Sequence, residues 1–371
     1  CIWDIPNHLS SSLLLFFRFM SLHKTLLQSL LLTTYQPRVF AFGDSTIDPG
    51  NKSNNNALHT FFKADRIPYG RDFPSHVSLG RFTNGRLPTY FLVSMWGIKS
   101  ELQAYLNKTV SNQDLLTGVS FASAGTGWDD FTTTVINVLH MNTQLRHFRL
   151  CLGRIQRRFG LQRANQVVGD ALFAIGSGTN DLIRSFYGLP GTRRWQFSIS
   201  AYQDFLLRNL KTFVERLYSM GARKLSITGL LPIGCLPFQV TAGSFMPSPH
   251  MFQCVCVTQQ NTDSQAYNTK LQFLIKRLQT TLPGVNIAYA DIYNPLMDML
   301  TNPGRYCFHE TLRGYCGTGT MEMGPLCNGV VPTCPDASRY VFWDTVHPTL
   351  ATYQVLANIY KTTVLPLLTG S

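Results

Sequence analysis

The sequence predicts an α/β protein in which helices cover both faces of a parallel sheet. Two observations support this: strand-like apolar runs alternate with helical patterns, and 44% of the residues are hydrophobic while only 14% are charged. Such alternation is typical of parallel sheets whose strands are connected by helices. With 371 residues, the chain can build one large core. We therefore expect a single domain over residues 37–371.

Residues 1–36 form a segment that we do not assign to this domain. The segment begins with Cys1 and contains two short apolar runs, 13–20 and 26–32, the first of which is interrupted by Arg18. Neither run is long enough to span a membrane. We interpret residues 1–36 as a degenerate or truncated signal segment. The alternative is an amphipathic helix that packs on the domain.

The candidate strands and helices follow from the periodicity of apolar residues. The candidate strands are residues 38–43, 118–122, 171–176, 224–230 and 286–291. The candidate helices are residues 86–96, 143–158, 202–220, 259–282 and about 350–367. In 202–220 the apolar residues recur at helical spacing, and Gly221 suits the C-terminal end of that helix. The segments 231–251 and 294–342 are rich in Pro, Gly and Cys, so we expect long surface loops there.

The first candidate strand ends at Gly43-Asp44-Ser45. Sites in parallel sheets form beyond the carboxyl ends of the strands, and Ser45 lies at such an end, on a turn that Gly43 permits. A serine hydroxyl becomes a useful nucleophile only when a base removes its proton. Ser45 is therefore a candidate nucleophile, although a serine here can also simply cap a helix. It is not flanked by Gly-x-Ser-x-Gly, so the nucleophile elbow of α/β-hydrolases does not apply.

Two further strand ends carry groups suited to hold a negatively charged oxygen. Gly125 follows the second candidate strand, where the missing Cβ lets a backbone N–H approach a substrate; Gly127 is the alternative. Asn180, in Gly178-Thr179-Asn180-Asp181, follows the third strand and offers a side-chain amide. Donors aimed at a developing oxyanion are commonly the largest catalytic contribution in acyl transfer. Taken singly, the first segment would indicate a flexible turn and the Asn-Asp pair a helix cap.

Asp344-Thr345-Val346-His347 places a carboxylate three residues before an imidazole. Asp344 can then hold Nδ1–H of the histidine, and Nε2 can act as base on the serine and as acid on the leaving alcohol. Pro348 suits the first position of the last helix. The pattern could also be half of a metal site, but no second His or Cys pair completes it. The predicted catalytic residues are Ser45, Asp344 and His347, with no metal and no cofactor.

The cysteines and the net charge indicate in which cellular compartment the protein acts and which binding partners it can have. Six of the nine cysteines lie from Cys254 to Cys334, with spacings that do not match zinc sites, so disulfides in an oxidising compartment fit better. Sequons occur at Asn51 and Asn107. The net charge of +12 is diffuse, so we expect no nucleic-acid partner and no stable membrane insertion. Contact with acidic polymers or anionic lipid surfaces, or a plain solvated surface, fits the charge equally well.

At this point the sequence resembles the plant-type GDSL esterase/lipase family, the extracellular lipase-like branch of the SGNH hydrolases. The resemblance spans roughly residues 38–367. The motifs that carry it are Gly43-Asp44-Ser45, Ile67-Pro68-Tyr69-Gly70-Arg71-Asp72-Phe73, Gly80-Arg81-Phe82-Thr83-Asn84-Gly85-Arg86, Gly118-Val119-Ser120-Phe121-Ala122-Ser123, Leu231-Pro232-Ile233-Gly234-Cys235-Leu236-Pro237 and Tyr340-Val341-Phe342-Trp343-Asp344.

The resemblance implies a three-layer α/β/α sandwich around a parallel sheet of about five strands. It implies a secreted serine esterase of the apoplast or cell wall, which hydrolyses a lipid acyl ester or an acetylated cell-wall polymer. Ser45, Gly125 and Asn180 would form the oxyanion hole, and Asp344 would support His347. Acyl transfer from the same acyl-enzyme, or a non-catalytic accessory role, are the alternatives. We expect the substrate to be lined by the loops around 61–73, 131–139 and 186–195.

The chain departs from the family pattern in the asparagine-rich segment 51–56 and in its cysteines. Cys307 stands where the family usually has glycine, and Tyr315-Cys316-Gly317 replaces a Cys-Cys-Gly triplet. The resemblance implies a disulfide between Cys235 and Cys256. It also implies a second cluster that contains Cys307, Cys316, Cys327 and Cys334. Because the number of cysteines is odd, at least one must lack a partner within the chain, and Cys1 and Cys151 are the candidates.

Overall fold

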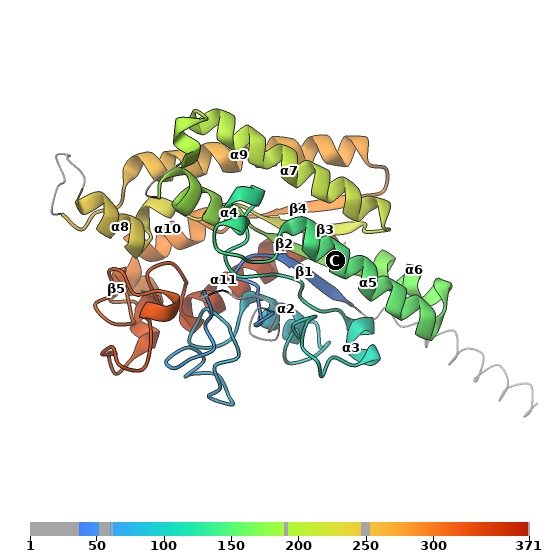
Figure 1. Ribbon diagram of the computed structural model, residues 1–371, viewed down its shortest axis with the longest axis horizontal. Helices are drawn as coiled ribbons and strands as arrows, with labels where there is room; N and C mark the ends of the chain where they lie inside the picture. The colour runs from blue at the N-terminus through green and yellow to red at the C-terminus, as the bar shows by residue number, and fades with distance from the viewer. Residues whose placement is uncertain (1–36, 52–59, 61, 189–191, 246–252, 370–371) are drawn as a thin grey trace, which may run out of the picture. The chain divides into compact units, whose positions relative to one another are not determined.

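Four parallel strands form the central sheet, and their order along the sheet is also their order along the chain (Figure 1). They are β1 (Val39–Gly43), β2 (Leu172–Gly176), β3 (Lys224–Thr228) and β4 (Asn286–Ala290). The predicted strand at 118–122 runs beside β1, where Phe121 N donates to Ala41 O at 2.8 Å and Ala41 forms a parallel bridge with Ser120. The predicted parallel sheet of about five strands is thus confirmed.

Helices cover both faces of this sheet and complete the three layers of the predicted α/β/α sandwich (Figure 1). Alternate residues of a strand point to opposite faces, so β1 contributes to two cores. Phe40 and Phe42 pack in the larger core, and Val39 and Ala41 pack in the other. The larger core is covered by α5 (Met141–Phe159), α6 (Leu161–Asp170), α7 (Ile199–Ser219) and α9 (Thr258–Thr281). The other core is covered by α2 (Pro88–Met95), α11 (Leu350–Thr363) and α12 (Leu365–Thr369).

The structure describes residues 37–51, 60, 62–188, 192–245 and 253–369. The expectation of a signal segment at residues 1–36 therefore lies outside the described residues, as does most of the asparagine-rich segment. Within the described part, none of the helices combines the length and the apolar character that crossing a membrane requires.

The start of α11 corrects one prediction. The helix begins at Leu350, and the side chain of Thr349 caps it by accepting a hydrogen bond from Thr352 N. Pro348 therefore precedes the cap and does not occupy the first helical position. A threonine hydroxyl can satisfy a free N–H of the first turn, whereas proline cannot.

The two segments predicted as long loops contain regular structure. Residues 231–251 include α8 (Pro237–Ser244), and residues 294–342 include most of α10 (Tyr293–Thr301) and a small parallel pair, β5 (Glu310–Gly314) with β6 (Tyr340–Phe342). The prediction missed these elements because they are short, and short elements show little periodicity. Three more short helices were also not predicted: α3 (Asn112–Thr117), α4 (Asp130–Thr134) and α6.

Two disulfides stabilise these two segments, which lie outside the central sheet. The expected Cys235–Cys256 bond is present, and a second bond joins Cys316 to Cys327.

The expected four-cysteine cluster is therefore wrong in part, because Cys307 and Cys334 are free thiols at exposed positions. Sγ of Cys334 instead contacts the hydroxyl of Tyr340 at 2.9 Å. Cys151 is free and buried, as expected for one of the unpaired candidates, and Cys254 is free and exposed.

Candidate active site

Gly43 ends β1 at a point where the chain passes very close to β2. Its φ is +145°, and a Cβ at this position would lie 1.8 Å from the carbonyl oxygen of Gly176. The side-chain amide of Gln144 pairs with the backbone of Gly43 at 2.8 Å (Gly43 N to Oε1) and 2.9 Å (Nε2 to Gly43 O). These contacts fix the turn that carries Ser45 to the carboxyl edge of the sheet.

Ser45, His347 and Asp344 meet at this edge although they come from opposite ends of the domain. Oγ of Ser45 lies 2.8 Å from Nε2 of His347, and Nδ1 of His347 lies 2.7 Å from Oδ2 of Asp344. All three side chains are buried. A carboxylate oxygen only accepts hydrogen bonds, so the contact with Asp344 places the proton on Nδ1, and Nε2 presents its lone pair to the serine hydroxyl. In this arrangement the histidine can take the serine proton.

Asp344 is held by three donors besides the imidazole. Its Oδ1 accepts the backbone amides of Val346 and His347, each at 2.8 Å, and its Oδ2 accepts the hydroxyl of Tyr69 at 2.8 Å. Burial, together with the neighbouring Asp344, raises the pKa of Tyr69 well above its ordinary value. Tyr69 therefore stays protonated, and its O–H donates a hydrogen bond to the carboxylate.

The predicted oxyanion donors face the same cleft as Ser45. Gly125 and Asn180 line this cleft together with Ser45 and His347. Among the described residues, the backbone N–H groups of Ser45 and Gly125 donate to no other group. Nδ2 of Asn180 donates one hydrogen to Thr126 O at 3.0 Å, which leaves its second hydrogen available. Among the described residues, the cleft is thus lined by three residues that each have an N–H hydrogen without an acceptor.

Gly127, the alternative to Gly125, does not line this cleft. A Cβ at Gly127 would lie 2.1 Å from Oδ1 of Asp181, so this glycine is required for the close approach of that carboxylate. Asp181 accepts the amides of Trp128 and Asp129 at 2.7 and 3.1 Å and the hydroxyl of Thr132 at 2.6 Å. Asp181 therefore anchors the loop after Gly125. The sequence had suggested that the Asn180-Asp181 pair caps the following helix, but the side chain of Asp181 does not cap it. Burial raises the pKa of Asp181 to about 7.

Asp48 joins the two loops that carry the candidate groups. Its Oδ1 accepts the amides of Gly50 and Asn51 at 2.8 and 2.7 Å, and its Oδ2 accepts the amide of Ala124 at 2.8 Å. The loop after Ser45 is therefore fixed to the residue before Gly125. The sequence signal for this role was only the position of Asp48 beside the Gly43-Asp44-Ser45 motif.

Asp44 is a second buried carboxyl group next to Ser45. Its Oδ1 accepts Thr46 N at 3.0 Å and Thr46 Oγ1 at 2.8 Å. Burial raises the pKa of Asp44 to about 6, and the bonds from Thr46 oppose this rise.

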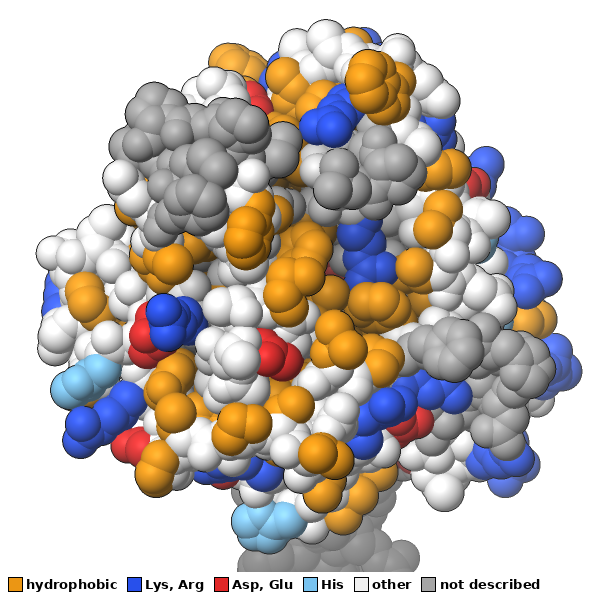
Figure 2. Space-filling model, turned by 60° about the vertical axis from the view of Figure 1, so that its left-hand side comes forward, with side chains coloured by type: hydrophobic (Ala, Val, Ile, Leu, Met, Phe, Trp, Pro, Cys, Tyr) orange, Lys and Arg blue, Asp and Glu red, His pale blue; other side chains and the backbone are white. Residues whose placement is uncertain are grey.

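The cleft at Ser45 is small, about 10 Å³, and aromatic side chains form part of its wall. The ring of Phe82 lies 4.8 Å from the imidazole of His347, and the guanidinium of Arg184 lies 4.0 Å from the ring of Phe62. Met323 lines the cleft as well. Figure 2 shows a face of the molecule on which hydrophobic and basic side chains gather around a hollow.

The predicted substrate loops coincide with this lining only in part. Phe62 falls in the predicted segment 61–73. From 131–139, Ile136 approaches Gly125, because a Cβ on that glycine would lie 2.3 Å from its Cδ1. None of the described residues in segment 186–195 lines the cleft. Arg184, just before it in the helical turn η1 (Asp181–Phe186), takes that place.

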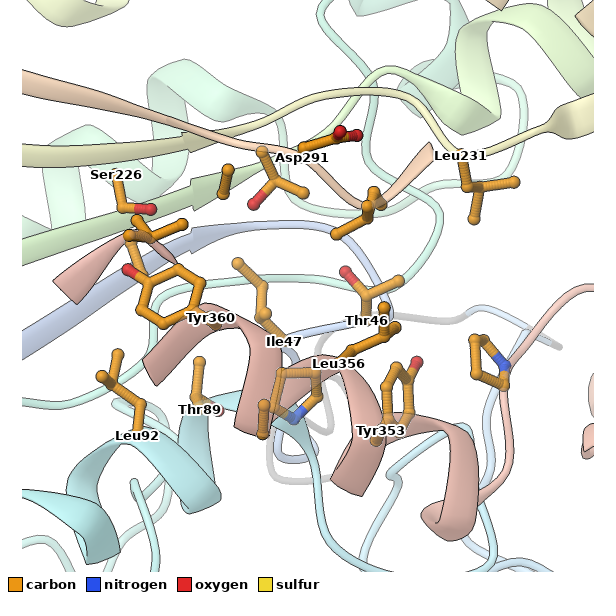
Figure 3. Close-up of a pocket in the computed structure, with 18 of the residues that line it drawn as sticks. Thr46, Ile47, Thr89, Leu92, Ser226, Leu231, Asp291, Tyr353, Leu356 and Tyr360 are labelled. Carbon is orange, nitrogen blue, oxygen red and sulfur yellow. The ribbon is translucent and has the colours of Figure 1, made fainter. Parts of the chain in front are cut away.

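A second cavity lies on the other face of the sheet, between the strands and helices α2 and α11 (Figure 3). Its volume is about 120 Å³, and most of its lining is apolar. The buried hydroxyls of Thr89 and Tyr353 face it and have no hydrogen-bond partner among the described residues. Thr46 and Pro348, the neighbours of Ser45 and His347 in the chain, form part of its wall. The cavity contains none of the predicted site residues.

Comparison with known proteins gives one consistent result. The family model described as GDSL-like lipase/acylhydrolase matches residues 39–359. A GDSL esterase/lipase of Arabidopsis thaliana is 46% identical over 350 residues, which cover 92% of this chain and 95% of the relative. Two further GDSL esterase/lipases of the same plant are 41% and 40% identical. Their alignments each cover 88% of this chain, and 88% and 89% of the relatives respectively.

Proposed function

Since the chain belongs to the GDSL-like lipase/acylhydrolase family and is a hydrolase of ester bonds, we propose that it cleaves carboxylic esters with Ser45 as nucleophile. His347 serves as the acid–base group and Asp344 orients it. The observation that carries the proposal is the chain of contacts from Ser45 Oγ to His347 Nε2 at 2.8 Å and from His347 Nδ1 to Asp344 at 2.7 Å. The backbone N–H groups of Ser45 and Gly125, which donate to no other described group, also support the proposal.

The proposed reaction has two stages. His347 Nε2 takes the proton of Ser45 while Oγ attacks the ester carbonyl, and the resulting oxyanion accepts hydrogen bonds from the amides of Ser45 and Gly125 and from Asn180. The imidazolium then gives its proton to the leaving alcohol, which leaves an acyl group on Ser45. A water molecule, deprotonated by the same imidazole, releases the acid and restores the serine.

We also propose that the enzyme acts outside the cell, in the apoplast or cell wall. The disulfides Cys235–Cys256 and Cys316–Cys327 support this, because disulfides persist in oxidising compartments. Its ester substrate would be a lipid acyl ester or an acetylated cell-wall polymer.

The test is hydrolysis of p-nitrophenyl esters from acetate to palmitate by the oxidised protein and by Ser45→Ala and His347→Ala. We expect turnover in the wild type and a loss of at least about 10³-fold in each variant, with a cooperative melt in all three. The chain-length optimum separates an acetylesterase from a lipase. The proposal fails if the folded wild type shows no turnover that depends on Ser45. A transferred acyl product in the presence of added alcohols would instead identify an acyltransferase.

A further inference from the structure

Arg184 is a cation in the cleft of Ser45 that no acidic side chain of the described residues neutralises. It lines the same cleft as Ser45, Gly125, Asn180 and His347. Within the part of the chain that the structure describes, its guanidinium forms no ion pair, and its one recorded contact is with the ring of Phe62 at 4.0 Å. The segments 52–59, 61, 189–191 and 246–252 contain neither Asp nor Glu, so these segments cannot supply a carboxylate for it either.

A cation in this position has a physical cost that a substrate can remove. Burial lowers the pKa of Arg184 to about 10, so the side chain is still charged at neutral pH. A partly buried charge without a partner is unfavourable, and an anion that enters the cleft relieves this. The excess of 32 Lys and Arg over 20 Asp and Glu also draws anions toward the surface.

We infer that the esters cleaved at Ser45 carry a carboxylate close to the scissile bond, and that Arg184 binds this carboxylate. The inference rests on the proposed function of Ser45. A guanidinium and a carboxylate match in charge and can form two parallel hydrogen bonds. A phosphate monoester, with a charge of about −1.5 to −2 at neutral pH, would leave negative charge without a partner beside the single arginine. The guanidinium lies over the face of the Phe62 ring, which supports it through a cation–π contact.

The test compares esters that differ in charge and hardly in shape. One pair places the charge on the alcohol part: 4-acetoxybenzoate and 4-acetoxybenzamide. The other pair places it on the acyl part: monomethyl adipate and the corresponding amide. Rates are measured for the wild type, Arg184→Gln and Arg184→Lys. Arg208→Gln on α7, where Arg208 is exposed, is the control for the same change in net charge.

We expect the wild type to prefer the carboxylate member of at least one pair. In Arg184→Gln, kcat/KM for that member falls by about 10- to 100-fold, while kcat/KM for the amide changes less than about threefold. Arg184→Lys recovers part of the loss, and Arg208→Gln behaves as the wild type. The inference is overturned if the wild type shows no preference in either pair. It is also overturned if Arg184→Gln slows both members equally, because the arginine would then serve the oxyanion or the fold.

A binding measurement keeps this inference separate from the proposed catalytic role. Calorimetry with 4-hydroxybenzoate, released from 4-acetoxybenzoate, and with adipate, released from monomethyl adipate, is carried out on Ser45→Ala and on Ser45→Ala with Arg184→Gln. Binding that is lost only in the double variant supports the carboxylate site, whether or not any ester is turned over. Equal binding in both, or none in either, counts against it. Turnover that persists in Ser45→Ala would count against the nucleophile alone.

Discussion

The hydroxyl of Tyr69 donates a hydrogen bond of 2.8 Å to Oδ2 of Asp344, across 275 residues of sequence. The same hydroxyl oxygen accepts the amide of Gly324 at 2.8 Å. Tyr69 therefore connects the carboxylate behind His347 to the loop that is closed by the Cys316–Cys327 disulfide. Tyr69 and Asp344 are fully buried. Water therefore cannot take the place of either group in this hydrogen bond without rearrangement.

Tyr69→Phe removes this hydrogen bond and leaves the amide of Gly324 without its acceptor. We expect the variant to be less stable by about 1–3 kcal/mol and its kcat to fall several-fold, because Asp344 is held less firmly. Urea denaturation and kinetics on one p-nitrophenyl ester measure the two effects. Tyr105→Phe, a change at a tyrosine outside the cleft, is the control. A variant with wild-type kcat would show that Tyr69 acts on the fold alone.

Asp44→Asn tests the buried carboxyl group beside the nucleophile. The asparagine can keep both bonds from Thr46, since only Oδ1 accepts them. The pKa of Asp44 is raised from 3.8 to about 6 in the folded protein. Between these values the folded state holds a proton that the unfolded state has lost, so the contribution of Asp44 to stability is present below about pH 4 and lost as pH rises through 6.

Asp44→Asn is therefore expected to flatten the fall in unfolding free energy from pH 4 to 6. At pH 8 the variant should be more stable than the wild type, by on the order of 2–3 kcal/mol. Urea titrations at pH 4, 5, 6, 7 and 8 give both curves. Parallel curves over this range would contradict the assignment of the titration to Asp44.

The two sequons differ in their surroundings. Asn51 is fully buried, its Nδ2 donates to the carbonyls of Ser120 and Ala122, and its Oδ1 accepts Leu106 N. Asn107 is half-buried, and among the described residues its side chain is engaged through Oδ1 alone, by Thr109. On secretion from a eukaryotic host we expect a glycan on Asn107 and none on Asn51. Mass spectrometry of the peptides after enzymatic glycan removal reads both positions; a folded protein glycosylated at Asn51 would refute this.

Ala357 on α11 borders the cavity of Figure 3. Ala357→Leu adds apolar atoms to this space, and we expect it to raise the free energy of unfolding by about 1 kcal/mol. Ala351→Leu makes the same change on the same helix outside the cavity and should shift stability by less than about 0.5 kcal/mol. Urea denaturation compares the two variants. A loss of stability in Ala357→Leu alone would mean that its surroundings cannot accept the added volume.

The sequence was sufficient for the sheet and for the residues that meet at its edge. Ser45, Asn180 and His347 each follow an apolar run or a local motif, and parallel strands bring such ends together. Their catalytic roles remain predictions. Tyr69 and Asp48 could not be assigned, because their bonds to Asp344 and Ala124 depend on tertiary contacts that no local pattern encodes.

The cysteines illustrate the same limit. Cys316 and Cys327 lie 11 residues apart and pair, whereas Cys334 is only slightly further along the chain and meets the hydroxyl of Tyr340 instead. Cys327 and Cys334 both lie within 18 residues of Cys316, so spacing alone does not select the partner, and the path of the loop decides the pairing. Arg184 was missed for a similar reason: the sequence shows the start of a helix at Asp181 but not which side chain turns toward the cleft.

The contact between Ser45 and His347 closes over 302 residues, and this has a consequence for biosynthesis. A ribosome has to add almost the whole domain after the nucleophile before the base exists. The intervening strands must also be paired before the two side chains can meet. A nascent chain therefore carries a serine hydroxyl without its base throughout synthesis. In the proposed mechanism, hydrolysis can therefore begin only when the domain is finished and folded.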